Sequence, residues 1–295
     1  MILEKIIRYK KKFVLSLKRN KSFSVLKKEV LALPKKRPAF LKALRKNGPV
    51  AVIAEIKRKS PSKGILRKNF DPVALAKGFE RSGAAALSVL TDEKFFGGSE
   101  KILRNIRAAV GLPILRKDFI LEEYQIWESR RIGADAVLLI AAILSEKEIT
   151  AFSRTARNLG LDVLLEVHTP EDAQKAKRAK AKLVGINNRD LNTFHVDLSV
   201  TRKIAGRFPK PVFLVSESGI QSRKDLIYLR ACGARAVLVG ETLMRQKNPA
   251  SALKKLLGLN KQSDQKASDA RRTLATAEAY REVRRTRERR VQRGR

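Results

Sequence analysis

Paired acidic and basic side chains are the feature of this sequence that could do chemistry. Glu55 and Lys57 lie two residues apart, Lys117 follows a short apolar run, and Glu166 lies within another. A lysine partly removed from water can donate a proton, and a neighbouring carboxylate can accept one. The chain has two histidines and one cysteine, so neither a nucleophile–histidine motif nor a His- or Cys-rich metal cluster accompanies them. The residues predict proton transfer with no metal and no cofactor.

The spacing brings several of these groups to one face. Residues two apart on a strand point the same way, so Glu55 and Lys57 share a face, as do Asn187 and Arg189. Other apolar runs are followed by further polar or glycine residues, namely Ser60, Glu217, Ser218, Gly219, Gly240 and Glu241. Charges buried without partners are costly, so such groups pair with one another or serve a ligand. Their convergence predicts a catalytic site.

A regular rhythm of short apolar runs predicts the elements that position these residues. Eight runs alternate with charged, helix-compatible stretches, and they cover 50–58, 85–91, 113–119, 136–143, 162–168, 183–190, 212–219 and 236–243. Apolar strands that alternate with helices indicate a parallel sheet covered on both faces. Eight such units favour a closed α/β structure, the (β/α)8 TIM barrel, whose active site lies at the carboxyl ends of the strands.

An open, doubly wound sheet is the alternative reading of this rhythm. It would usually carry a G-x-G-x-x-G loop after the first strand, whereas the first run here continues as EIKRKSPSKG, so the open sheet is disfavoured. Helix-start signals lie between the runs. Asp71 followed by Pro72 predicts one helix start and Thr169 another, and Ser145 with Glu148 forms a capping box.

The histidines and the cysteine are predicted to be structural. His168 has the opposite strand parity to Glu166 and should face the helices, and His195 lies in a loop. Cys232 lies where a helix turns into the last strand, and we expect it to belong to the core.

The N-terminal region, residues 1–47, carries sixteen basic and two acidic residues. It contains two amphipathic stretches, 2–18 and 22–32, which we expect to be extra helices packed over a barrel end. A transit peptide is the weaker reading, because the region contains Glu4 and lacks the Ser- and Arg-rich character of such signals.

The barrel domain is predicted over residues 48–260. Residues 261–295 differ from it, because they are rich in Arg, Ala, Glu and Gln and have few large apolar side chains. This composition predicts a basic tail that is helical or disordered, with binding to RNA or an acidic partner as the alternative.

The net charge of +36 indicates which partners the surface attracts. Such a field draws phosphorylated small-molecule substrates and also gives nonspecific binding to polyanions. No apolar run approaches the ~18 residues of a membrane span, so we expect no membrane association. The single cysteine fits a reducing compartment, and we expect a cytoplasmic monomer or weak oligomer.

Six motifs carry a resemblance to a known family. The runs AEIKRKSPSKG, LRKDFI, LLEVHT, GINNRDL, SESGI and VGETLMR resemble, in this order, the strand-end motifs of indole-3-glycerol-phosphate synthases. The resemblance covers roughly residues 2–257, including the ILEKI opening. It implies ring closure, decarboxylation and dehydration of 1-(2-carboxyphenylamino)-1-deoxyribulose 5-phosphate, a carboxy-lyase reaction of tryptophan biosynthesis.

The resemblance also implies catalytic roles. Lys117 in LRKDFI would be the general acid that protonates the ketone, and Glu166 in LLEVHT the general base of the later dehydration. Glu55 and Lys57 would position the substrate and assist proton transfer, with Lys57 holding the substrate carboxylate.

The remaining motif residues would bind and orient the substrate. Asn187 and Arg189 would orient the sugar and the catalytic groups, and Ser218 and Glu217 would contact the substrate. Gly219, Gly240 and Glu241 would lie at the phosphate with Ser60 nearby, and Phe119 would line the anthranilate ring.

Two other functions compete with this one. A sister phosphate-binding barrel such as phosphoribosylanthranilate isomerase would need a Cys/Asp pair at strand ends, and the only cysteine, Cys232, lies outside a strand end. A polyanion-binding protein that uses a retired barrel would suit the charge. However, no nucleic-acid motif is present, and aromatic residues make up 6% of the chain, which offers few stacking platforms.

Overall fold

The computed structural model describes residues 2–191 and 193–259. The predicted tail over 261–295 lies outside the described residues. The chain divides into two units between Leu253 and Lys254, and residues 254–259 are the described part of the second unit. Within the described ranges, no helix is both long and apolar enough to cross a membrane.

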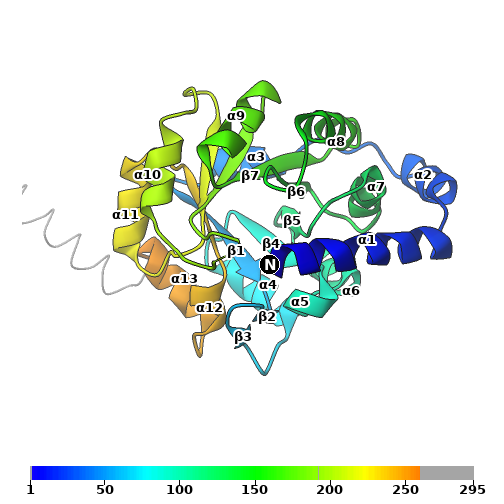
Figure 1. Cartoon of the computed structure of the whole chain (residues 1–295). Helices are drawn as coiled ribbons and strands as arrows, with labels where there is room; N and C mark the ends of the chain where they lie inside the picture. The colour runs from blue at the N-terminus through cyan, green and yellow to red at the C-terminus, as the bar shows by residue number, and fades with distance from the viewer. Residues whose placement is uncertain (1, 192, 260–295) are drawn as a thin grey trace, which may run out of the picture. The chain divides into compact units, whose positions relative to one another are not determined.

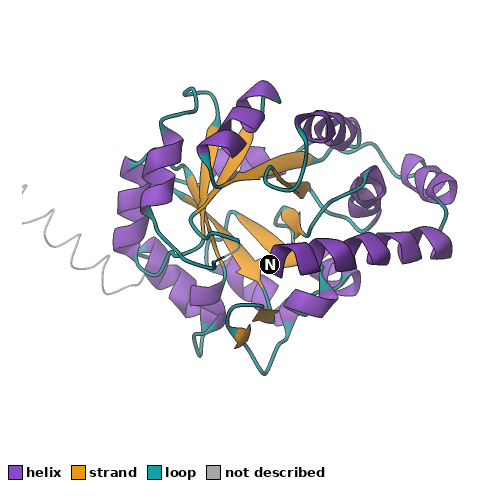
Figure 2. Ribbon diagram, in the orientation of Figure 1, coloured by secondary structure: helices purple, strands orange, loops and turns teal. Residues whose placement is uncertain are grey.

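Eight parallel strands close into a barrel, as the apolar runs predict. The strand order around the barrel is β1-β10-β9-β8-β7-β6-β5-β4, with β4 returning to β1. Helices surround the strands in Figure 2. The strands are β1 (Ala51–Ile56), β4 (Ala86–Leu90), β5 (Ile114–Lys117), β6 (Ala136–Ile140), β7 (Asp162–Val167), β8 (Leu183–Asn187), β9 (Phe213–Glu217) and β10 (Ala236–Val239).

The strands are shorter than the predicted runs, because several of the polar motif residues belong to loops. After β9, Ser218 and Gly219 adopt φ angles of 66° and 81°, a left-handed conformation that ends the strand. After β1, a small antiparallel pair forms between β2 (Lys59–Ser60) and β3 (Gly64–Ile65), which the sequence did not predict. The chemistry-bearing residues thus lie at strand ends and in the loops that follow.

The intervening helices begin where the capping signals predict. The Asp71 side chain accepts hydrogen bonds from two backbone N–H groups at the start of α4, and capping boxes open α8 at Ser145 and α9 at Thr169. The helices after β1 are α4 (Pro72–Arg81), α5 (Glu93–Phe96), α6 (Glu100–Ala109), α7 (Glu123–Arg131), α8 (Glu146–Asn158), α9 (Pro170–Arg178), α10 (Ser199–Ala205), α11 (Arg223–Ala231), α12 (Glu241–Met244) and α13 (Pro249–Leu257).

The N-terminal extension reaches both ends of the barrel. The two predicted helices are α1 (Ile2–Asn20) and α2 (Phe23–Leu31). In Figure 1, α1 begins over the strands and runs outward to α2. The sequence missed a third helix, α3 (Phe40–Lys46), because seven residues are too few to show a helical period. Phe40 and Leu44 of α3 are fully buried against the amino-terminal ends of the strands, where they close the barrel floor.

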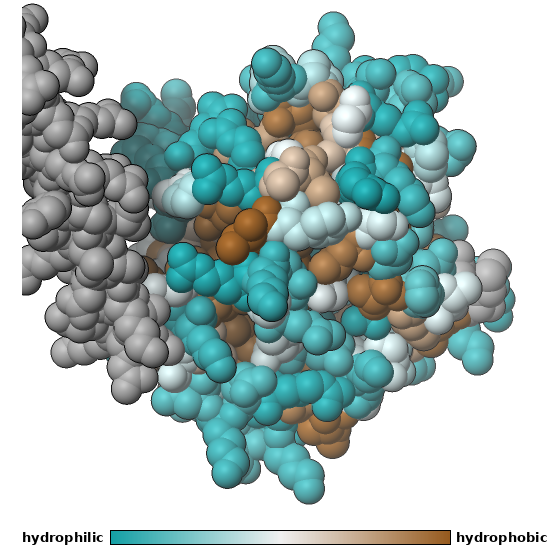
Figure 3. All heavy atoms as spheres, turned by 90° about the vertical axis from the view of Figure 1, so that its left-hand side faces the viewer, coloured by the Kyte–Doolittle hydropathy of each residue, from teal (hydrophilic) through white to brown (hydrophobic). Residues whose placement is uncertain are grey.

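The core has two layers. One lies inside the barrel, where Leu115, Leu138 and Leu164 meet, and the other fills the space between strands and helices around Val137 and Ile149. Each fully buried leucine or valine contributes about 1.5–3 kcal/mol. Figure 3 shows one face of the surface, where hydrophilic residues predominate and apolar residues appear in separate small areas.

Candidate active site

A cavity of about 630 Å³ opens at the carboxyl ends of the strands. This volume lies within the range of small-molecule sites. Every site residue predicted from the sequence lines it, namely Glu55, Lys57, Ser60, Lys117, Phe119, Glu166, Asn187, Arg189, Glu217, Ser218, Gly219, Gly240 and Glu241. The cavity also has an apolar wall that the sequence did not predict, which comes from Ile2, Leu3 and Ile6 of α1 and from Phe96 of α5.

Lys117 is the centre of the charged network in this cavity. Its Nζ donates to Glu166 Oε2 at 2.9 Å and lies 3.3 Å from Glu217 Oε2. Burial alone would lower the pKa of this ammonium group, but Glu166, Glu217 and Glu55 together outweigh burial and hold the pKa well above its usual range. Lys117 is therefore a charged donor that faces the cavity.

Glu55 and Lys57 form a second pair beside the first. Lys57 Nζ lies 2.6 Å from Glu55 Oε1. Burial would raise the pKa of Glu55, but Lys57 and Lys117 outweigh it and lower the pKa below its ordinary value. Gly240 makes room for this carboxylate, because a Cβ at that position would lie 2.3 Å from Glu55 Oε1. The glycine is thus required by close packing in the barrel mouth.

Glu217 is a buried carboxylate that its neighbours only partly stabilise in the charged form. Burial, and then the nearby Glu166, raise its pKa to about 7, although Lys117 opposes the shift. Its Oε1 atom is buried and accepts no hydrogen bond within the described residues. The side chain fits because Gly185 on β8 lacks a Cβ, which would lie 2.0 Å from Glu217 Oε1. Near neutral pH, Glu217 is therefore poised to exchange a proton.

Asn187 and Arg189 connect the acid–base pairs to the rim. Asn187 Nδ2 donates to Glu166 Oε1 at 3.2 Å, and Asn187 Oδ1 accepts from the Arg189 backbone N–H at 3.0 Å. The Arg189 guanidinium lies 3.2 Å from Glu241 Oε2 and 3.5 Å from Ser62 Oγ. Glu166 is thus oriented by an amide and by Lys117 together.

The opposite side of the mouth is lined by aromatic rings. Phe96 and Phe119 lie with ring centroids 6.1 Å apart and planes tilted by 35°. Phe119 follows β5, and Phe96 lies on the short helix α5 between β4 and α6. No sequence signal marks Phe96, because α5 is four residues long and lies outside the predicted runs.

Three residues that were predicted to be structural lie away from the chemistry. His168 and His195 do not line the cavity, and His168 Nδ1 is 2.7 Å from the Asn187 carbonyl oxygen. Cys232 caps α11 and is half-buried, so the expectation that it belongs to the core is wrong. Among residues 2–191 and 193–259, no group of three or more His, Cys, Asp or Glu side chains is arranged to hold a metal.

Fold and site together define a (β/α)8 barrel with an acid–base cluster at its carboxyl-terminal mouth, the usual place for catalysis in this architecture. The family model for indole-3-glycerol phosphate synthase matches residues 3–256. The chain therefore belongs to the indole-3-glycerol phosphate synthase family.

Curated relatives agree with this assignment. The chain is 49% identical to the indole-3-glycerol phosphate synthase of Acetivibrio thermocellus over 71% of its length and 80% of the relative. It is 44% identical to that of Ruminiclostridium cellulolyticum over 88% of its length and 99% of the relative. It is 45% identical to that of Carboxydothermus hydrogenoformans over 87% of its length and the whole relative.

Solved structures of low sequence identity support the fold alone. KGPDC from Streptococcus mutans aligns with a TM-score of 0.57 at 12% identity, over 70% of this chain and 95% of that one. A thiamine phosphate pyrophosphorylase from Pyrococcus furiosus aligns with a TM-score of 0.53 at 17% identity, over 72% and 95%.

The raised pKa of Glu217 predicts a pH-dependent effect of Glu217→Gln on stability. The folded protein keeps a proton on Glu217 up to about pH 7, whereas the ordinary glutamate pKa is 4.5. The stability that this proton gives is complete below pH 4.5 and is lost as the pH rises through about 7. Glutamine stays neutral, so Glu217→Gln does not lose this stability. In urea unfolding, the free energy of unfolding of the variant should therefore rise by roughly 2–3 kcal/mol relative to that of the wild type as the pH goes from 5 to 8.

The exposed Glu93→Gln is the matched control and should show no such trend. A difference between wild type and Glu217→Gln that stays constant from pH 5 to 8 would contradict the raised pKa.

Proposed function

We propose that this chain catalyses the indole-3-glycerol phosphate synthase reaction as a carbon–carbon lyase. It converts 1-(2-carboxyphenylamino)-1-deoxyribulose 5-phosphate to indole-3-glycerol phosphate, with loss of carbon dioxide and water, in the cytoplasmic synthesis of tryptophan. The observation that carries the proposal is the Lys117 ammonium, held between Glu166 and Glu217 at the mouth of a barrel of this family.

Ring closure requires an acid next to the ketone. Lys117 donates its proton to the ketone oxygen while the ring carbon that bears the carboxylate attacks the carbonyl carbon. The new carbon–carbon bond forms, carbon dioxide leaves with the electron pair returning to the ring, and the ketone oxygen becomes a hydroxyl. A positioned general acid contributes about 10²–10⁴ in rate to such a step. The partners of Lys117 keep it charged until the substrate arrives.

Dehydration follows and requires a base and an acid in turn. Glu166 accepts the proton that leaves the ring-closed intermediate, Lys117 donates a proton to the departing hydroxyl, and water leaves as the indole forms. Asn187 donates to one oxygen of Glu166 and Lys117 to the other, so the carboxylate is oriented on both sides. Glu217 lies on the far side of Lys117, where it can return a proton to the lysine after ring closure.

The anionic ends of the substrate are matched by basic and backbone groups. Lys57 binds the substrate carboxylate and exchanges its present partner Glu55 for it. Arg189 orients the sugar, and Ser218 contacts the substrate from the loop after β9. Ser60 Oγ is buried and has no hydrogen-bond partner among the described residues, which leaves it available to a ligand.

The phosphate is held by the loops after β9 and β10. Gly219 and Gly240 line the cavity in the two loops where many (β/α)8 barrels bind a phosphate through backbone N–H groups. The carboxylate of Glu241 is 3.2 Å from Arg189 and 3.3 Å from Arg245, so its charge is balanced and does not repel the anion. The aromatic wall of Phe96 and Phe119 receives the anthranilate ring.

The sister isomerase is disfavoured by the position of Cys232. The residue lies at the end of α11, away from the cavity, so it cannot provide the cysteine half of a Cys/Asp pair.

The general-acid role predicts the effect of Lys117→Met. Loss of the donor should reduce kcat/KM by about a thousandfold while the barrel remains folded. The assay mixes purified protein with the anthranilate-linked deoxyribulose phosphate and follows indole fluorescence. Lys224→Met, which removes an exposed lysine on α11, should retain the wild-type rate. A folded wild type that forms no indole product would refute the proposed function, and a Lys117→Met variant that keeps a tenth of the activity would refute the role of the lysine.

The basic surface also supports a secondary affinity for polyanions, and we propose α1 as one of its sites. Five basic residues lie exposed along this helix, namely Lys5, Arg8, Lys11, Lys12 and Arg19. Their charges can neutralise phosphates of a nucleic acid without reading its sequence.

This affinity should weaken steeply with salt. For a single-stranded RNA oligonucleotide, log affinity decreases with log salt concentration. This negative slope should become shallower by about 1.4 when Lys5 and Lys12 are both changed to Ser, since each phosphate contact contributes about 0.7. Changing the exposed Lys210 and Lys224 on the barrel gives the control, with a smaller effect expected. Binding that does not respond to salt would contradict this electrostatic account.

A further inference from the structure

A second buried lysine lies outside the acid–base cluster. Lys10 of α1 is 1% exposed, and its Nζ is 2.8 Å from Asp92 Oδ2 and 2.7 Å from Asp118 Oδ1. Burial would lower the pKa of Lys10, but Asp118 and Asp92 outweigh it and raise the pKa above its ordinary value. An ammonium group held so far from water by two carboxylates is costly to bury, so its geometry is tightly constrained.

Asp92 connects Lys10 to Phe96. Its Oδ1 atom accepts the Phe95 backbone N–H at 2.8 Å and so caps α5, the helix that carries Phe96. Its Oδ2 atom has Lys10 as ion partner and accepts no other hydrogen bond within the described residues. The N-terminal cap of α5 is therefore a carboxylate that also faces α1.

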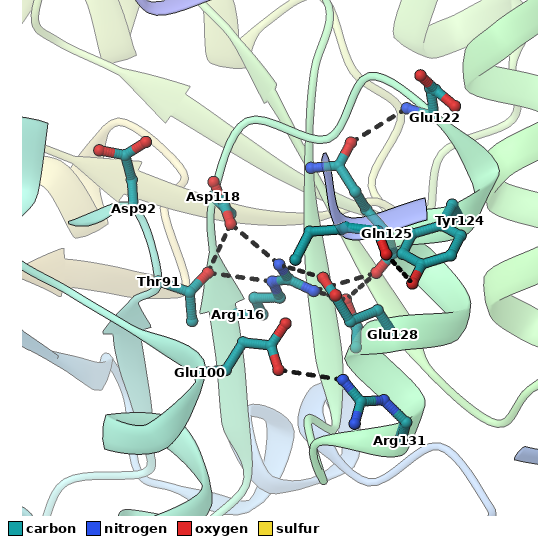
Figure 4. Close-up of polar contacts among 12 residues, drawn as sticks. Thr91, Asp92, Glu100, Arg116, Asp118, Glu122, Tyr124, Gln125, Glu128 and Arg131 are labelled. Atoms are coloured by element: carbon teal, nitrogen blue, oxygen red, sulfur yellow. Dashed lines mark hydrogen bonds and ion pairs between the residues drawn. The ribbon is translucent and has the colours of Figure 1, made fainter. Parts of the chain in front are cut away.

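Asp118 connects Lys10 to Phe119 and to the general acid. It lies between Lys117 and Phe119 in the chain, and its Oδ1 atom accepts the Phe119 backbone N–H at 2.8 Å. Its Oδ2 atom accepts from Thr91 Oγ1 at 2.7 Å and from Arg116 Nη2 at 3.1 Å. Figure 4 shows Asp118 between Thr91 and Arg116, with Asp92 beside it. Two basic residues thus fix the loop after β5 through Asp118: Arg116 on β5 and Lys10 on α1.

Arg116 is itself rigidly held. Its guanidinium lies 2.8 Å from Glu128 Oε2 and donates to Thr91 Oγ1 at 3.0 Å and to the Gln125 carbonyl at 3.2 Å. These partners belong to the α7 side of the barrel and to the end of β4. Lys10 is the contact that adds α1 to this network, and Ile2, Leu3 and Ile6 on the same helix line the cavity.

We propose that Lys10 is a positioning residue for the aromatic part of the substrate. By binding Asp92 and Asp118 at once, it sets the separation of Phe96 and Phe119 and holds the apolar start of α1 against them. Phe96, Phe119 and the apolar start of α1 together form a slot for the anthranilate ring. This inference rests on the proposed function, because it assigns the ring of that substrate to the slot.

The test compares a ligand with a ring and a ligand without one. The probes are 1-(2-carboxyphenylamino)-1-deoxyribitol 5-phosphate, in which a hydroxyl replaces the ketone, and ribitol 5-phosphate. Calorimetry on Lys10→Met should show about tenfold weaker binding of the first and less than twofold change for the second. Lys10→Arg keeps the charge and should recover most of the affinity. An equal loss for both probes, or a loss for neither, would overturn the proposal.

Lys18→Met is the matched control on the same helix. Lys18 pairs with Glu122 at the start of α7, and this contact leaves Asp92 and Asp118 untouched. The Lys18→Met variant should bind both probes as tightly as the wild type does. If Lys18→Met weakens the ring-bearing probe as much as Lys10→Met does, then general loosening of α1 explains the effect and the proposal is wrong.

Asp92→Asn covers the case in which Lys10→Met does not fold. Asparagine can still cap α5, but it removes one charge from the ion triad. It should weaken the ring-bearing probe about threefold and spare ribitol 5-phosphate. Unchanged binding of both probes by folded Asp92→Asn would overturn the proposal.

Fluorine NMR separates this inference from the proposed function. In protein labelled with 4-fluorophenylalanine, the Phe96 and Phe119 signals should shift in Asp92→Asn and Lys10→Met but not in Lys18→Met. A wild type that neither binds the ring-bearing probe nor forms product refutes the proposed function, while the fluorine shifts still decide whether Lys10 positions the rings. Unmoved signals in both variants would overturn the role of Lys10.

Discussion

The cost of removing charge from water governs this structure. A lysine or glutamate inside a barrel is tolerated only when partners replace its hydration. Lys117 has such partners in Glu166 and Glu217, and Glu55 has them in Lys57 and Lys117. Glu217 is buried beside Glu166, and Lys117 does not fully offset these two effects, so the pKa of Glu217 is raised. The same imbalance that strains the site makes it ready to move protons.

The backbone accommodates these charges in two ways. Gly185 and Gly240 leave space that a Cβ would fill, so the carboxylates of Glu217 and Glu55 can lie inside the barrel against these strands. Strand alternation then separates two networks on neighbouring residues of β5. Lys117 faces the cavity and its carboxylates, whereas Arg116 faces the helix layer and Glu128, whose pKa burial raises to about 7. One four-residue strand therefore anchors both the chemistry and the scaffold behind it.

Much of this architecture follows from local sequence patterns. The eight strands are predictable because each is a continuous apolar run, and the convergence of Glu55 with Lys57 follows from the two-residue period of a strand. What could not be predicted depends on contacts between segments far apart in the sequence. Phe96 lies on a single helical turn, α3 is too short to show a period, and Lys10 looks like any other lysine of a basic helix. The burial of Lys10 depends on Asp92 and Asp118, which lie far along the chain in the loops after β4 and β5.

The protonation state of Lys117 tests the central claim most directly. With lysines labelled with ¹⁵N at Nζ, and the Lys117 signal assigned by its absence from Lys117→Met, the pH can be raised while each amine is observed. Exposed lysines should lose their protons near the ordinary pKa of about 10.4, and Lys117 should remain an ammonium at that pH because its carboxylate partners hold the charge. A Lys117 signal that titrates with the exposed lysines, or at lower pH, would contradict the account.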